Sequence, residues 1–186
     1  MRWRLRWGWL LPHSRLWVEC ARYCLRMTDF VVRRAARQDA AFLREMQYEA
    51  LFVPPGGAPF PAAIVDQPEI AHYYRNFGAS PTDVGRIAAS ESGLPLGAAW
   101  VRLLTGADAG FGHVDDHTPE LVIAVTAARR NRGLGAALLI DLLAEVSRCS
   151  LSVDARNPAV RLYERVGFTG VATGSDALTM LFDRSL

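Results

Sequence analysis

The sequence contains no lysine, only three cysteines, and no apolar run long enough to cross a membrane. Without lysine the chain cannot carry the P-loop of nucleoside-triphosphate binding proteins, in which a lysine contacts the phosphates. Cys20, Cys24 and Cys149 form no CxxC pair, so neither a disulfide framework nor a zinc site is indicated, and a reducing cytoplasm fits best. A net charge of only +2 argues against nucleic-acid binding as the main activity.

The remaining composition is that of one globular domain. The chain has 186 residues, of which 51% are hydrophobic and 22% charged, enough for a single buried core. Residues 1–26 differ in kind, because they hold four of the five tryptophans and six arginines against one glutamate. One interpretation is an amphipathic arm at a membrane surface. We favour an extension outside the fold, because Pro12 interrupts the short apolar stretch, and we expect the domain to span residues 27–186.

Hydrophobic periodicity predicts strands alternating with helices after a hairpin, which is typical of a mixed α/β domain. Strands are expected at 30–33, 84–89, 96–104, 120–125, 149–153 and 177–182, with a hairpin turn at 91–95. Helices are expected from residue 39 to about 50, then at 68–75, 132–147 and 158–166. The Pro/Gly-rich loop at 54–61 is a candidate lid over a pocket.

The stretch RRNRGLGAALL, at 129–139, lies between a predicted strand and the apolar stripe of a helix. Glycine lowers helix stability, so Gly133 and Gly135 at the start of a helix need another explanation. The first turn of a helix exposes unpaired N–H groups and the positive end of the dipole, and glycines let an anion approach them closely. The stretch therefore predicts a phosphate or pyrophosphate site. A dinucleotide-binding GxGxxG turn fits less well, because Leu138 stands in place of its third glycine.

Arg130, Gly133 and Gly135 match a motif, Arg-x-x-Gly-x-Gly after a strand, through which the sequence resembles the GCN5-related N-acetyltransferase (GNAT) superfamily. The segment NPAVRLYERVGF at 157–168 is similar to a second motif of that family. The resemblance covers about 27–186, although its specific motifs lie only in 119–168. It implies an α/β (α+β) fold with a mixed, mostly antiparallel central sheet flanked by helices, the acyl-CoA N-acyltransferase fold.

The resemblance also implies acetyl-CoA as cosubstrate, held between splayed strands at 120–125 and 149–153. Backbone groups near Ile123 and Val125 would pair with the pantetheine, with the Val125 N–H near the thioester oxygen, and Asn157 would contact the cosubstrate. The implied pyrophosphate loop consists of Arg130, Asn131, Arg132, Gly133, Leu134, Gly135 and Ala136.

Direct acetyl transfer needs a base for the attacking amine and an acid for the departing thiolate. The resemblance assigns Tyr163 as the acid, and the alternative is a core tyrosine bonded to the backbone. Glu120 is the candidate base, acting through water, and the alternative is a charged residue that begins a strand. Strand alternation places Glu120 on the same face as Val122 and Ala124.

The expected function is acetyl-CoA-dependent acetyl transfer to a primary amine of a small molecule or peptide. A non-catalytic acyl-CoA-binding sensor or interaction domain is the alternative, and the presence of both Tyr163 and Glu120 favours the enzyme. His113 and His117 are four residues apart in a loop, where their imidazoles would not converge, so we expect no metal. We expect no nucleic-acid or membrane partner. The sequence does not specify the acceptor, the length of the acyl group or whether the protein forms a homodimer.

Overall fold

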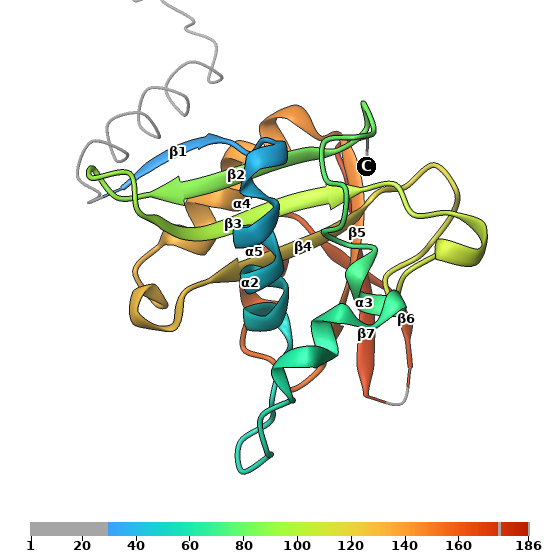
Figure 1. The fold of residues 1–186 in the computed structure, drawn as a ribbon. Coiled ribbons are helices and arrows are strands. Elements are labelled where there is room, and N and C mark those ends of the chain that lie inside the picture. Colours follow the sequence, from blue (N-terminus) through green and yellow to red (C-terminus); the bar gives the residue numbers. More distant parts are fainter. Residues whose placement is uncertain (1–29, 175, 186) are drawn as a thin grey trace, which may run out of the picture.

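The computed structural model describes residues 30–174 and 176–185, so the expected extension at 1–26, with Cys20 and Cys24, lies outside the described residues. Within them a seven-stranded sheet carries helices on both faces (Figure 1). The strands are β1 Val31–Arg34, β2 Val84–Ala89, β3 Pro95–Arg102, β4 Glu120–Val125, β5 Arg148–Asp154, β6 Thr169–Thr173 and β7 Ala177–Asp183. The helices are α2 Ala40–Ala50, α3 Pro68–Ala71, α4 Leu134–Glu145 and α5 Val160–Arg165, with short 3-10 turns η2 Arg37–Asp39, η3 Ala62–Asp66, η4 Gly106–Asp108 and η5 Ala127–Arg129.

The strand order in the sheet is β1-β2-β3-β4-β5-β7-β6. Neighbouring strands are antiparallel except β4 and β5, which run parallel and share a single Cα pair, Glu120 with Ser150. Beyond that pair the two strands diverge, as Figure 1 shows at the centre of the molecule. The expected mixed, mostly antiparallel sheet flanked by helices is therefore confirmed.

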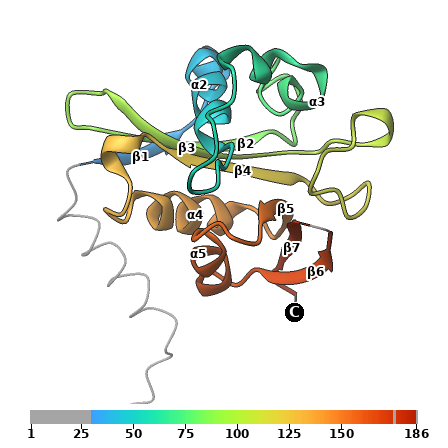
Figure 2. The same ribbon diagram turned by 90° about the horizontal axis from the view of Figure 1, so that it is seen from below.

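The sheet separates two apolar layers. Figure 2 shows α2 and α3 on one face of the sheet, called the α2 face, and α4 and α5 on the other, called the α4 face. Successive strand residues point to opposite faces, so Leu121 packs in the α4-face cluster, whereas Val122 and Ala124 pack in the α2-face cluster. The apolar stripe predicted for the helix after Gly133 is buried on the α4 face, with Leu138, Leu139 and Leu142 fully enclosed.

One strand was not predicted from the sequence. β6 pairs with β7 at the edge of the sheet, and all five of its residues are exposed. An edge strand exposed on both sides has no need for the apolar alternation by which strands are recognised in a sequence. The final strand expected at 177–182 is present as β7 and extends one residue further.

The described residues have a helix at each of the four expected positions, and three of the four are shorter than expected. The helix expected from residue 132 begins at Leu134, because Gly133 adopts a left-handed conformation with φ of 82°. It ends at Glu145, not at residue 147. The helix expected at 68–75 is regular only over Pro68–Ala71, and the one expected at 158–166 covers Val160–Arg165.

Candidate active site

The segment that joins β4 to α4 presents a row of unpaired backbone N–H groups. Asn131 and Gly133 adopt left-handed conformations, with φ of 60° and 82°. No hydrogen bond joins the N–H groups of residues 131–136 to another group in the described part of the chain. The first helical bond runs from the Ala137 N–H to the Gly133 carbonyl, at 3.0 Å. Six successive donors at the positive end of a 12-residue helix form an anion-binding turn.

The two glycines of this turn serve different purposes. A Cβ at Gly133 would meet no atom within 4 Å, so glycine is needed there for its left-handed conformation. A Cβ at Gly135 would lie 3.3 Å from Leu162, on α5, and 4.0 Å from Ile123. Gly135 therefore allows α4 and α5 to pack closely, a reason that the sequence motif alone does not disclose.

The arginines of the turn differ in their partners. The Arg130 guanidinium donates to the Glu49 carboxylate at 2.5 Å and to the Val125 carbonyl at 3.2 Å. Arg130 thus ties the turn to the end of α2 and to the last residue of β4. Neither Arg129 nor Arg132 forms an ion pair with any described residue, and Arg132 is exposed. Arg132 is accordingly a free positive charge beside the unpaired N–H groups.

Tyr163, on α5, is buried with only 8% of its surface exposed. Its ring packs edge-on against Phe168, with centroids 5.8 Å apart. The hydroxyl has no hydrogen-bond partner among the described residues, so the backbone bond expected of an ordinary core tyrosine is not formed. Burial raises the pKa of Tyr163 to about 12, which keeps the phenol protonated at neutral pH. The ring is thus buried, and its hydroxyl is a protonated donor that makes no hydrogen bond within the described residues.

Asn157 precedes α5 and shapes its start. Its side-chain oxygen accepts the Ala159 N–H at 2.9 Å, but Asn157 is not the N-cap, because regular helix begins at Val160 and Ala159 holds the cap position. This bond leaves the carboxamide N–H groups of Asn157 available to a ligand. At the other end of α5, Gly167 has φ of 104° and follows the last helical turn, as expected of a helix-ending glycine.

The carboxylate of Glu120 is buried, with 1% of the residue exposed, and is held by three donors. Oε1 accepts the Gly110 N–H at 2.7 Å, and Oε2 accepts the Gly112 N–H at 2.7 Å and the Tyr73 hydroxyl at 2.8 Å. The β3–β4 pairing has no register shift, so Glu120 lies on the α2 face as strand alternation predicted. Beside it on β5, the Ser150 hydroxyl is buried without a hydrogen-bond partner among the described residues.

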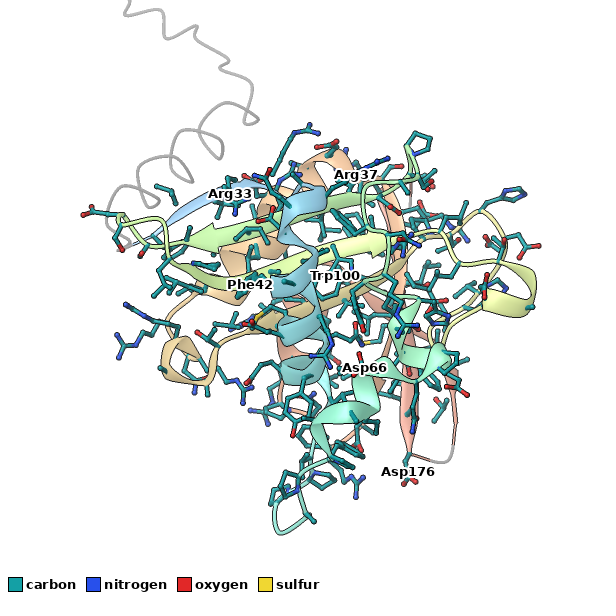
Figure 3. The ribbon with its side chains drawn as sticks, in the orientation of Figure 1. Arg33, Arg37, Phe42, Asp66, Trp100 and Asp176 are labelled. Atoms are coloured by element: carbon teal, nitrogen blue, oxygen red, sulfur yellow. The ribbon has the colours of Figure 1, made fainter. Side chains whose placement is uncertain are left out.

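Tyr73 links Glu120 to the rest of the α2 face. Its hydroxyl also accepts the Phe111 N–H at 2.8 Å, and its carbonyl accepts the indole N–H of Trp100 at 2.8 Å. Figure 3 labels this tryptophan on β3 beside α2. Burial and the neighbouring Glu120 charge raise the pKa of Tyr73 above its ordinary range, so the phenol stays a donor. The sequence places Tyr73 in the helix expected at 68–75 and does not disclose its contact with Glu120, which spans 47 positions of the chain.

The candidate acid and base approach the diverging strands from opposite faces. Glu120 lies on the α2 face, whereas Tyr163 belongs to the α4-face cluster. Ile123 and Val125, the two residues expected to face the cosubstrate, are half-buried and pack at the edge of that same cluster. A thioester lying between β4 and β5 would therefore have one titratable group on each side.

The described part of the chain has neither a cluster of metal ligands nor a membrane-spanning helix. Residues 30–174 and 176–185 contain no group of three His, Cys, Asp or Glu side chains able to hold a metal ion. His113 instead contacts the Asp116 carboxylate at 3.7 Å. The helices of the same residues include none long and apolar enough to span a bilayer.

The fold is similar to that of solved acetyltransferases. The structure of yncA from Salmonella typhimurium with its cofactor acetyl-CoA is 20% identical, with a TM-score of 0.59 over 84% of this chain and 95% of that one. The Escherichia coli ribosomal-protein-S18-alanine N-acetyltransferase is 18% identical, with a TM-score of 0.56 over 84% and 95%. A spermidine N-acetyltransferase chimera of Vibrio cholerae SpeG and hSSAT is 15% identical, with a TM-score of 0.52 over 85% and 97%.

A mixed sheet that opens between β4 and β5 beside an anion-binding turn defines the acyl-CoA N-acyltransferase class of fold. Residues 95–170 match the family model of the Acetyltransferase (GNAT) domain, and a comparison with curated proteins finds no significant match. The match over residues 95–170 and the shared fold confirm the resemblance to the GNAT superfamily seen in the sequence motifs.

Proposed function

We propose that this GNAT domain is an N-acetyltransferase that uses acetyl-CoA to acetylate a primary amine. The observation that carries the proposal is the row of unpaired N–H groups at 131–136, directly after a strand that diverges from its parallel neighbour. In this proposal the turn binds the pyrophosphate through its backbone, with Arg132 and Arg130 supplying charge. The contributing residues are Arg130, Asn131, Arg132, Gly133, Leu134, Gly135 and Ala136.

The pantetheine would lie between β4 and β5. The backbone of Ile123 and Val125 would bind it from one strand, and the free carboxamide N–H groups of Asn157 would bind it from the loop before α5. Acetyl-CoA supplies an activated acyl carbon and a thiolate leaving group. Acetyl is the acyl group that we propose, by analogy with the yncA structure.

The chemistry requires one proton to leave the amine and one to reach the departing sulfur. The amine lone pair forms a C–N bond at the acyl carbon as the C–S bond breaks. Glu120, the candidate base on the α2 face, would take the amine proton through water, and its three hydrogen bonds hold the carboxylate in place. Tyr163, on the α4 face, would give its proton to the sulfur, since its hydroxyl is protonated and has no other partner among the described residues.

A non-catalytic acyl-CoA sensor is the competing function. A sensor needs the turn at 131–136 but has no use for a buried, protonated phenol that lacks a partner among the described residues.

The free, buried thiol of Cys149 is consistent with a reducing cytoplasm, which we propose as the location.

The test combines ligand binding with turnover. Acetyl-CoA should raise the melting temperature of the full chain far more than ATP or NAD does, because a ligand stabilises in proportion to its binding to the native state. Thiol release should then depend on an added amine, with spermidine and an alanine-starting peptide as the first two candidates. Equal melting shifts from all three nucleotides would indicate a generic anion site, and acetyl-CoA binding without thiol release would favour the sensor.

A further inference from the structure

The side chain of Gln47 is the most unusual buried polar group on the α2 face. Gln47 lies on α2 with only 5% of its surface exposed, on the side of the helix that also buries Leu43 and Met46. Its carboxamide oxygen is buried without a hydrogen-bond partner, and its NH2 group likewise makes no hydrogen bond within the described residues. Buried polar groups are nearly always paired, so a buried amide oxygen without a partner indicates a binding position.

The location of Gln47 matches that of the acceptor in the proposed reaction. α2 crosses the sheet over β4, the strand that carries Glu120 and diverges from β5 (Figure 1). Gln47 and Glu120 both lie on the α2 face, which is the face from which the amine would be deprotonated. Gln47 and Glu120 therefore lie on the same side of the sheet, with Leu43 and Met46 buried beside Gln47 on α2.

The charges around Gln47 do not favour a polycation. Glu49 and Asp66 form ion pairs with arginines at 2.5 Å, and Glu120 accepts three hydrogen bonds from uncharged groups. Glu45, also on α2, lies on its exposed side. A polyamine would be recognised by free carboxylates. Those of Glu49, Asp66 and Glu120 are already engaged. Glu69 and Asp108, which form no ion pair within the described residues, line a hollow with His72 and Phe111.

We propose that Gln47 binds an amide group of the acceptor, so that the substrate is a primary amine next to an amide, as at the N-terminus of a peptide. The carboxamide oxygen accepts the N–H of the substrate amide, and the Gln47 NH2 donates to its carbonyl. A carboxamide is the one uncharged side chain that offers both a donor and an acceptor in the geometry of a peptide group. The inference rests on the proposed function and adds the acceptor class to it.

A pair of small acceptors tests this recognition. Alaninamide and alanine methyl ester share the amine and the carbonyl and have amines of similar basicity, but only alaninamide has an amide N–H for the Gln47 oxygen. We expect the kcat/KM of the full chain to favour alaninamide by about tenfold or more, because the ester leaves the buried oxygen unpaired. Spermidine should be turned over more slowly than either.

The variant Gln47→Met keeps the length of the side chain and removes both polar ends. We expect the preference for alaninamide to fall to within about twofold, while the acetyl-CoA melting shift stays the same and the melting temperature does not fall. The matched control is Gln67→Met, at an exposed glutamine before α3, which should change none of these quantities.

The outcomes separate the inference from the function on which it rests. A Gln47→Met variant that melts at a lower temperature and keeps its preference would show a structural role and overturn the inference. Turnover of spermidine in preference to alaninamide would also overturn it, while leaving the acetyltransferase function intact. Failure of the wild-type chain to bind acetyl-CoA would instead remove the proposed function.

Discussion

The hydroxyl of Tyr73 donates to the carboxylate of Glu120 at 2.8 Å, joining the segment after α3 to the first residue of β4. The same carboxylate accepts the N–H groups of Gly110 and Gly112, so three distant parts of the chain meet at one buried charge. The approach is close, because a Cβ at Gly110 would lie 2.0 Å from the Tyr73 hydroxyl oxygen. The candidate base is therefore also a structural centre of the α2 face.

This relationship predicts unequal effects for two adjacent tyrosines. Tyr73→Phe leaves the buried Glu120 carboxylate and the Phe111 N–H each short of a partner, and should lower the free energy of unfolding by about 1 to 3 kcal/mol. Tyr74→Phe removes only a 3.1 Å bond to the solvent-exposed Asp66 and should cost less than about 1 kcal/mol. Urea unfolding of the two variants checks this, and equal losses would mean that the Glu120 network does not stabilise the fold.

A valine at Gly133 should cost stability and abolish cosubstrate binding. The left-handed φ of 82° is strained for any branched residue, at about 1 to 2 kcal/mol, and relieving the strain turns the neighbouring N–H groups away from a bound anion. Gly93, in the hairpin turn, offers a matched control because its φ is 84° and a Cβ there also meets nothing within 4 Å. Gly93→Val should lose similar stability yet keep the acetyl-CoA melting shift, and a Gly133→Val variant that binds normally would refute the position of the site.

The buried thiol of Cys149 should make the folded state less stable at alkaline pH. Burial raises the pKa of its thiol from an ordinary value of 9.0 to about 12. The folded state therefore keeps the thiol proton that the unfolded state releases. The contribution of the buried thiol to the free energy of unfolding is complete below pH 9 and is lost as the pH rises toward 12. The free energy of unfolding should fall less steeply between pH 9 and 11 in Cys149→Ala than in the wild type. Parallel pH curves would contradict the burial of the thiol.

The domain boundary leads to a fourth prediction. A chain that begins at Met27 should keep both its melting temperature and its acetyl-CoA shift, because the residues proposed to bind the cosubstrate lie within 120–163. Calorimetry of the two chains measures the first quantity, and titration with acetyl-CoA measures the second. A truncated chain that melts well below the full one would assign residues 1–26 to the domain.

Features set by local periodicity were predictable from the sequence. The strand at Glu120–Val125, the apolar stripe of α4 and the facing of Glu120 follow from repeats of two and 3.6 residues. The anion-binding turn was predictable because helix starts and left-handed glycines leave a local signature. β6 was missed, since an exposed edge strand has no apolar alternation to recognise.

Features that depend on contacts between distant segments were not predictable. The bond from Tyr73 to Glu120 and the contact of Gly135 with Leu162 bring together residues from separate elements. The unpaired amide of Gln47 could be read from the sequence only as one polar position in an apolar stripe. A polar side chain at such a position usually makes a hydrogen bond to a distant segment of the chain. No sequence pattern shows that this hydrogen bond is missing.

Single-turnover acetyl transfer by Tyr163→Phe tests the central claim most directly. The change keeps the ring and its packing against Phe168, and the hydroxyl that it removes has no partner among the described residues, so stability and acetyl-CoA affinity should be nearly unchanged. The rate of amine acetylation should fall by about one to three orders of magnitude, the usual scale for loss of one general acid. A variant that acetylates at the wild-type rate would contradict the catalytic role of Tyr163.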